Sequence, residues 1–170
     1  LEPIQAGRFY VHTPDHPAST NPKLVDFTIP ASQAFGTGQH ATTAGCLAML
    51  TYMKAQGVVV RNCADIGTGT GLLAFAALSL WPRALATASD IDAVCADVVE
   101  ANARANGIRM GSGNGQLVMT IADGMAHPLL AARGPYDLIM ANILAGPLVA
   151  LAPDFGAALV PGGHLVLAGL

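Results

Sequence analysis

The stretch that decides the fold is Asp65-Ile66-Gly67-Thr68-Gly69-Thr70-Gly71. It closes a short apolar run, carries three glycines at alternate positions, and leads at once into a helical pattern at residues 72–80. Glycines between a strand and a helix let a ligand lie directly on the backbone, because no Cβ stands in the way. A second apolar run ends in Asp90, where a carboxylate is placed to hold a ribose. Together these features predict a site for a nucleoside-type cofactor.

The composition favours one α/β domain. The chain has 170 residues, of which 52% are hydrophobic and 11% are charged, and its mean hydropathy is +0.48. Such values suit a buried parallel sheet covered by alanine-rich helices. The net charge of −3 argues against general nucleic-acid binding, which needs a basic face. No uninterrupted apolar run is long enough to predict a membrane span, so no membrane partner is expected.

The cysteines predict neither a metal site nor a disulfide framework. Cys46, Cys63 and Cys95 are widely spaced and form no Cys-x-x-Cys pair. We interpret them as small buried apolar side chains in a reducing compartment, and without a secretory signal pattern we expect a cytoplasmic location. The sequence starts at Leu1 and stops within an expected strand at residues 164–170, so we expect a piece of a longer protein.

The first third of the chain does not follow the strand–helix alternation of the rest. Residues 1–57 contain two short extended patterns, at 7–12 and 24–29, and then an amphipathic helical pattern at about 42–56. We expect this part to pack on a core formed by residues 58–170, so that both parts make one structural domain.

From residue 62 onward, strand and helix patterns alternate. Strands are predicted at residues 62–66, 85–89, 117–121, 137–141 and 164–170. Helices are predicted at about residues 71–80, 92–106, 125–132 and 146–159, and Pro161-Gly162-Gly163 is predicted to turn into the last strand. Alternation of this length predicts a doubly wound, mostly parallel sheet with helices on both faces, which is a Rossmann-like architecture.

Three ligands compete for the glycine loop. A phosphate loop needs a lysine after its glycines, and none is present. A dinucleotide fingerprint needs its third glycine three residues after the second, but Gly71 follows Gly69 by two and position 72 is Leu72. The Asp-x-Gly-x-Gly-x-Gly form suits S-adenosylmethionine, which has no phosphate and needs only a close approach to the backbone. A plain glycine turn without a ligand is the remaining alternative.

The second strand adds acidic residues to this site. Asp90 is placed to accept hydrogen bonds from both ribose hydroxyls, although a carboxylate here can instead cap the next helix, which is the interpretation we prefer for Asp92. Ile91 is then expected to flank the adenine as an apolar wall. Asp123, just after the third strand, suits either the adenine amino group or an ordinary Asp-Gly turn.

Two further runs resemble a known family. Asn142-Ile143-Leu144-Ala145-Gly146-Pro147-Leu148 is similar to the signature of the PrmA family, the bacterial methyltransferases of ribosomal protein L11. Ala34-Phe35-Gly36-Thr37-Gly38-Gln39-His40-Ala41-Thr42-Thr43 resembles the family's Phe-Gly-Thr-Gly-x-His-x-Thr-Thr loop. Asp65 to Gly71, Asp90-Ile91-Asp92 and Pro161-Gly162-Gly163 match in order and spacing, so the resemblance runs from about residue 3 to the end.

The resemblance implies a fold, a cofactor and a set of binding residues. The fold is the class I methyltransferase sheet with strand order 3-2-1-4-5, whose final hairpin is missing here. The cofactor is S-adenosyl-L-methionine, with no metal. The cofactor-binding residues that it implies are Thr43, Gly67, Asp90 and Asn142, with Phe35, Thr37 and Gly38 at the mouth of the site. The patterns described above add the loop residues Asp65, Gly69 and Gly71 and the flanking Ile91 and Asp123.

The resemblance also implies a reaction and a partner. The family methylates lysine and α-amino groups of ribosomal protein L11, which it docks through an amino-terminal domain that these residues do not supply. Methyl transfer from a sulfonium is an in-line displacement, so the protein chiefly positions the reactants. The Asn142 carbonyl is suited to accept a hydrogen bond from the incoming amine, which makes it the candidate catalytic residue, although a plain strand-end cap is the alternative. His40 suits either a base or a backbone contact.

Three other functions compete with this one. The first is a class I methyltransferase that acts on another protein or on a small molecule. The second is a nucleotide-dependent oxidoreductase, which the glycine spacing disfavours. The third is a non-catalytic binding domain, which the presence of Asp90 and Asn142 together disfavours.

Overall fold

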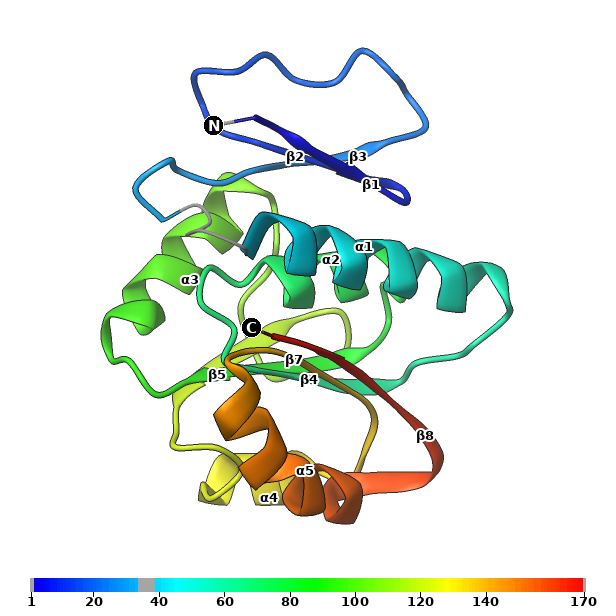
Figure 1. The fold of residues 1–170 in the computed structure, drawn as a ribbon, viewed down its shortest axis with the longest axis vertical. Coiled ribbons are helices and arrows are strands. Elements are labelled where there is room, and N and C mark those ends of the chain that lie inside the picture. The colour runs from blue at the N-terminus through cyan, green and yellow to red at the C-terminus, as the bar shows by residue number, and fades with distance from the viewer. Residues whose placement is uncertain (1, 34–38, 170) are drawn as a thin grey trace.

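The computed structural model describes residues 2–33 and 39–169. Its core is a five-stranded, wholly parallel sheet with helices on both faces (Figure 1). The strands lie in the order β6 (Leu117–Ile121), β5 (Leu85–Asp90), β4 (Asn62–Ile66), β7 (Tyr136–Asn142) and β8 (Leu159–Ala168). Counted along the core alone, this is the predicted order 3-2-1-4-5. The fold class is therefore confirmed.

The sheet reverses its direction of growth between β4 and β7. The chain builds outward from β4 through β5 to β6, then returns to place β7 on the other side of β4. Ile66, Asp90 and Asn142 end the three central strands on the same edge. In open α/β sheets, ligands bind outside the carboxyl ends of the strands at such a switch point.

Helices α1 (Gln39–Ala55), α2 (Leu72–Leu80) and α3 (Val94–Ala105) cover one face of the sheet, whereas α4 (Pro128–Arg133) and α5 (Ala145–Ala158) cover the other (Figure 1). Helix α2 contacts α1 on one side and strands β4 and β5 on the other. Its composition explains this position, because a helix that is apolar all round must be buried on all sides. None of the helices in the described ranges is long and apolar enough to cross a membrane.

A second, smaller sheet lies over α1 (Figure 1). It consists of β1 (Ile4–Ala6), β2 (Phe9–His12) and β3 (Val25–Thr28), with β1 antiparallel and β3 parallel to the central β2. The two expected extended patterns correspond to β2 and β3, whereas β1 was not predicted because it has only three residues. The Phe9 and Phe27 rings stack 5.7 Å apart, and Phe27 also contacts Phe75 of α2 at 6.1 Å. One apolar cluster thus joins this sheet to the core.

The last strand is longer than predicted. It was expected to begin at residue 164, after a Pro-Gly-Gly turn, but β8 begins at Leu159, whose partner is Tyr136. Between the Tyr136–Leu159 pair and the Leu138–His164 pair, the register shifts and β8 bulges outward. Pro161-Gly162-Gly163, which were predicted to form a turn before the strand, form this bulge within the strand instead.

Candidate functional site

A cavity of about 510 Å³ opens at the carboxyl ends of β4, β5 and β7. It lies where the direction of the sheet reverses, which is the place that the topology predicts for a ligand. Its lining residues come from these three strand ends, from the segments after β6 and β8, from α1 and from α5: they are Gln39, Thr42, Ile66, Gly67, Gly69, Asp90, Ile91, Ala122, Asp123, Gly124, Asn142, Ile143, Leu144, Pro147, Leu151 and Gly169.

The glycine loop forms the floor of this cavity. The Gly67 and Thr68 N–H groups both donate to the Ser89 carbonyl at 2.9 Å, which ties the loop to β5. Gly67 has a φ of +72°, and a Cβ added to it would collide with Ile143 Cγ2. Only glycine meets both requirements, because other residues rarely adopt positive φ and no room exists for a side chain.

Asp65 lies beneath the loop rather than in the cavity. Its side chain is 1% exposed, and its Oδ2 accepts hydrogen bonds from the Thr68 hydroxyl at 2.7 Å and from the Ala74 N–H at 3.2 Å. No donor among the described residues reaches its buried Oδ1. Burial raises the pKa of Asp65 to about 7, although the two hydrogen bonds oppose this shift. Asp65 therefore shapes the loop and the start of α2, and the surrounding groups only partly compensate the desolvation of its ionised form.

Asp90 has its carboxylate on the cavity surface and is half-buried. Its Oδ2 accepts the Gly69 N–H at 2.9 Å, and its Oδ1 accepts the Asp92 N–H at 3.0 Å. Each carboxylate oxygen can accept a further hydrogen bond. The backbone contacts therefore fix the orientation of the carboxylate and leave acceptor capacity toward the cavity. Asp92 accepts the Val94 N–H at 3.1 Å, but α3 begins at Val94 and its N-cap residue is Ala93, so the expected capping position of Asp92 is wrong by one residue.

Asn142 lines the cavity from the end of β7. Its Nδ2 donates to Thr43 Oγ1 at 3.2 Å, and Thr43 is a buried residue of α1. No donor among the described residues binds Asn142 Oδ1. The amide nitrogen is thus held by α1, while the carbonyl oxygen remains available as an acceptor at the cavity surface.

Apolar side chains complete the walls. Ile91 and Leu144 stand at the rim with exposed fractions of 68% and 66%, and both line the cavity, as does Leu151. The cavity therefore combines apolar walls with a few oriented polar groups, which is the usual composition of a small-molecule site.

The structure brings most of the predicted site residues together. Those that line the cavity are Gly67, Gly69, Asp90, Ile91, Asp123 and Asn142. Those that stand behind it are Thr43, Asp65 and Gly71. Gly71 has a φ of +93° and leaves no room for a side chain against the Phe75 ring. Phe35, Thr37 and Gly38 lie outside the described residues.

Several lining residues were not predicted. Gln39 and Thr42 come from the first turn of α1, which begins three residues earlier than expected. Ile143 and Leu144 belong to the run that carries the family resemblance, so that run was the signal for them. Leu151 lines the cavity from α5, where it lies four residues after Pro147. This spacing puts both residues on one helix face, and it was the available signal.

The described cysteines behave as structural residues. Cys46 and Cys63 are buried as expected, but Cys95 is only partly buried, which corrects the prediction. Burial raises the pKa of Cys63 to about 12, so this thiol stays protonated at neutral pH. Within residues 2–33 and 39–169, no group of three or more His, Cys, Asp or Glu is placed to hold a metal ion.

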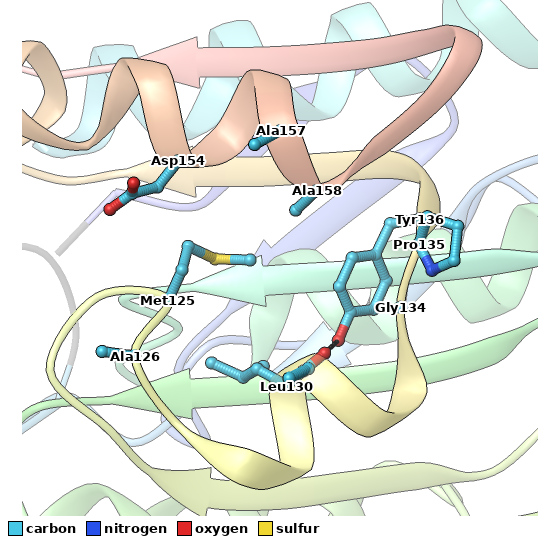
Figure 2. A pocket seen from close by; sticks show the side chains of 10 residues that line it. Met125, Ala126, Leu130, Gly134, Pro135, Tyr136, Asp154, Ala157 and Ala158 are labelled. Carbon is cyan, nitrogen blue, oxygen red and sulfur yellow. Dashed lines mark hydrogen bonds between the residues drawn. The ribbon is translucent and has the colours of Figure 1, made fainter.

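A second cavity, of about 520 Å³, lies on the α4–α5 face of the sheet. Figure 2 shows Ala157 and Ala158 of α5 across from Leu130 of α4, with Tyr136 at one end. Asp154 is the one charged side chain that lines it, and the Tyr136 hydroxyl is already used to donate to the Leu130 carbonyl at 2.6 Å. This cavity offers few polar partners to a nucleoside, so the cavity at the strand ends is the candidate site.

Comparison with known proteins identifies the family. The sequence model of the family described as "Ribosomal protein L11 methyltransferase (PrmA)" matches residues 1–170. The ribosomal protein L11 methyltransferase of Rhizobium meliloti (strain 1021) is 44% identical over 170 residues, which are the whole of this chain and 56% of that protein. The chain therefore spans about half the length of the curated relatives it matches.

Solved structures agree with this assignment. The crystal structure of a ribosomal protein L11 methylase from Lactobacillus delbrueckii subsp. bulgaricus superposes with a TM-score of 0.77 and 29% identity, over 98% of this chain and 79% of that chain. Coclaurine N-methyltransferase, solved with N-methylheliamine and SAH, shares the fold alone, with a TM-score of 0.53 and 19% identity over 72% of this chain and 34% of that chain. On its sequence and its fold, the chain belongs to the ribosomal protein L11 methyltransferase (PrmA) family.

Proposed function

We propose that the cavity at the carboxyl ends of β4, β5 and β7 binds S-adenosyl-L-methionine, and that the chain is the cofactor-binding part of an N-methyltransferase of ribosomal protein L11. The observation that carries this proposal is that Asp90 and Asn142, from strands on opposite sides of β4, line one cavity above the glycine loop. The family name and the SAH bound to coclaurine N-methyltransferase, which shares the fold, support the same cofactor.

The residues present suit the parts of this cofactor. Asp90 offers two oriented carboxylate oxygens to the ribose hydroxyls, and Ile91 offers an apolar surface to the adenine. Asp123 is the acceptor that we assign to the adenine amino group. The amino-acid part lies on the glycine loop, where the absence of a side chain at Gly67 leaves the backbone accessible. When bound, the cofactor supplies an electrophilic methyl group on a sulfonium.

Asn142 is the residue that we assign to the acceptor amine. A lysine amine has a pKa of about 10.4 and must arrive unprotonated to act as a nucleophile. Asn142 Oδ1 can accept a hydrogen bond from that amine and so direct its lone pair into the cavity, because Thr43 already holds the other end of the amide. A neutral carbonyl also favours the positive charge that develops on the nitrogen.

We further propose how the rest of the protein takes part. Residues 1–57 and 58–170 form two parts of one structural domain, joined by the apolar cluster between the small sheet and α2. The relatives are longer than this chain, and docking of ribosomal protein L11 is assigned to the part that this chain does not span. The reaction takes place in the cytoplasm on a protein rather than on nucleic acid, consistent with the net charge of −3.

Calorimetric titration of the chain with S-adenosylhomocysteine and, separately, with NADH tests the cofactor. We expect saturable binding of S-adenosylhomocysteine and none of NADH, and the reverse result would identify a nucleotide-dependent oxidoreductase. Incubation of the full-length protein with labelled methyl donor and either purified L11 or a bacterial extract tests the substrate. Label on L11 amines, located by mass spectrometry, is the expected result. Label on other molecules alone would assign a different substrate.

A further inference from the structure

Asn102 is a buried polar residue that the proposed mechanism does not use. It lies on the inner face of α3 with an exposed fraction of 2%. Its Nδ2 donates two hydrogen bonds, to the Thr70 carbonyl at 3.0 Å and to Gln33 Oε1 at 2.9 Å. A buried amide group with both N–H bonds engaged joins its partners rigidly, because a lost partner leaves a buried polar atom unsatisfied.

The first partner, Thr70, belongs to the glycine loop. Hydrogen bonds hold the shape of this loop, and one of them joins the Thr68 hydroxyl to the Asp65 carboxylate beneath it. On the β5 side, Gly69 donates to Asp90, and Gly67 and Thr68 donate to Ser89. On the α3 side, the Thr70 carbonyl accepts from Asn102. Asn102 thus holds the loop at Thr70, whereas Asp90 holds it at Gly69.

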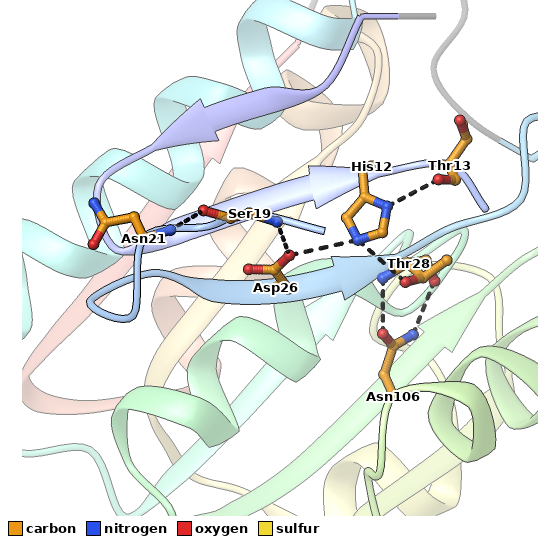
Figure 3. Close-up of polar contacts among 7 residues, drawn as sticks. All are labelled: His12, Thr13, Ser19, Asn21, Asp26, Thr28 and Asn106. Carbon is orange, nitrogen blue, oxygen red and sulfur yellow. Dashed lines mark hydrogen bonds and ion pairs between the residues drawn. The ribbon is translucent and has the colours of Figure 1, made fainter. Parts of the chain in front are cut away.

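The second partner, Gln33, belongs to the segment that leaves the small sheet. One helical turn after Asn102, Asn106 pairs with the Thr28 backbone, where its Oδ1 accepts the N–H at 2.8 Å and its Nδ2 donates to the carbonyl at 3.0 Å (Figure 3). Asn106 also donates to the Asn102 carbonyl at 2.9 Å. Residues 28–33 are therefore attached to α3 at both ends. Along the chain they lead toward α1, whose first turn contributes Gln39 and Thr42 to the cavity.

We propose that Asn102 is a positioning residue: by binding Thr70 and Gln33 together, it sets the position of the glycine loop relative to the segment that leads to the α1 wall of the cavity. The inference rests on the proposed function, because the ligand whose affinity it controls is S-adenosylmethionine or its demethylated product. Asn102 itself does not line the cavity, so it acts through Thr70 and Gln33 rather than by contact with the ligand.

The decisive variants change Gln33, which is only partly buried, whereas Asn102 is buried. Gln33→Ala removes the acceptor, and we expect S-adenosylhomocysteine to bind about 5-fold more weakly, which is the effect of one hydrogen bond. Gln33→Glu keeps an acceptor oxygen and is expected to stay within about 2-fold of the parent chain. Ser32→Ala, at an exposed neighbouring position, is the matched control and is expected to leave affinity unchanged.

Asn102→Ala removes both contacts, and we expect it to weaken binding about 10-fold or more. Because Gln33 acts only through Asn102, the double variant is expected to bind no more weakly than Asn102→Ala alone. Urea unfolding of Gln33→Ala is expected to show a small loss of stability from the lost hydrogen bond, with the chain still fully folded under the conditions of the binding assay, which separates positioning from unfolding. If Asn102→Ala does not fold, the Gln33 variants still decide the question.

Hydrogen–deuterium exchange of the chain without ligand gives a second readout. Faster exchange of residues 67–72 in Gln33→Ala, but not in Gln33→Glu or Ser32→Ala, is the expected result. Equal affinity and equal exchange in Gln33→Ala and the parent chain, or affinity losses that add in the double variant, would overturn the inference. If the parent chain does not bind S-adenosylhomocysteine, the proposed function fails instead, and the exchange experiment still reports on the Asn102 linkage.

Discussion

The buried carboxylate beneath the glycine loop predicts an unusual pH dependence of stability. Burial raises the pKa of Asp65 to about 7, from 3.8 in an unfolded chain. Between these values, the folded chain holds a proton that the unfolded chain has released. Stability therefore falls as the pH rises through this window, which is the reverse of the usual behaviour of a paired carboxylate. Asp65→Asn removes the titration while it keeps an oxygen for Thr68 and Ala74.

The size of the effect follows from the pKa shift. The rise in the pKa of Asp65 from 3.8 to about 7 corresponds to about 4 kcal/mol between the two protonation states. Only part of this free-energy difference contributes to stability between pH 5.5 and pH 8.5, where the chain can be studied. Between pH 8.5 and pH 5.5, linkage predicts that Asp65 adds about 2 kcal/mol to the free energy of unfolding. For a chain of this size, that equals a rise of about 1 M in the urea midpoint.

Urea unfolding of the parent chain and of Asp65→Asn, followed by circular dichroism at several pH values, measures this contribution. Subtraction of the variant's profile from that of the parent chain removes the titration of all other groups. Asp154→Asn, at an exposed carboxylate of α5, is the matched control. A difference profile for Asp65→Asn that is flat, or that rises toward high pH, would refute the reasoning, because the carboxylate would then be adequately solvated or paired in the folded chain.

Three further predictions concern the cavity. Gly67→Ala is expected to abolish S-adenosylhomocysteine binding and to destabilise the chain by about 2 kcal/mol, because Gly67 has a positive φ and the added Cβ would collide with Ile143. Gly146→Ala, whose added Cβ contacts no other atom, is the control for calorimetry and urea unfolding. Asp90→Ala is expected to weaken that binding about 10-fold, through loss of charge-assisted hydrogen bonds, and unchanged affinity by calorimetry would remove Asp90 from the site. Asn142→Ala is expected to lower turnover of the full-length protein about 100-fold while product affinity changes less than about 3-fold; equal turnover would exclude a role in orienting the amine.

The core of the fold was predictable because its signals are local and periodic. The strand β4 and the helix after it follow directly from an apolar run, three glycines and a second apolar run, and the observed bounds agree closely. The strand β1 was not predictable, because three residues carry no period and pairing with β2 alone defines it. The start of β8 was missed for a related reason: its pairing with Tyr136 precedes a Pro-Gly-Gly sequence that locally signals a turn.

The site was predictable in its residues that face the ligand and less so in the residues behind them. Gly67, Asp90 and Asn142 follow a recognisable rule, since each ends or directly follows a strand. The contact between Asn142 and Thr43 spans 99 positions in sequence and depends on how α1 crosses the sheet. The role of Asn102 is equally non-local, because an asparagine in the middle of a helix shows its partners only when the helix is packed.

Because the sheet reverses direction at β4, the residues assigned to the cofactor and the residue assigned to the acceptor amine come from two different segments of the sequence. The residues assigned to the ribose and the adenine lie between the end of β5 and the start of α4, whereas the residue assigned to the acceptor amine ends β7. Exchange of the second segment between relatives would therefore alter which nucleophile is accepted while the methyl donor is retained. A chain built in this way can acquire new substrates while the residues assigned to the methyl donor stay unchanged.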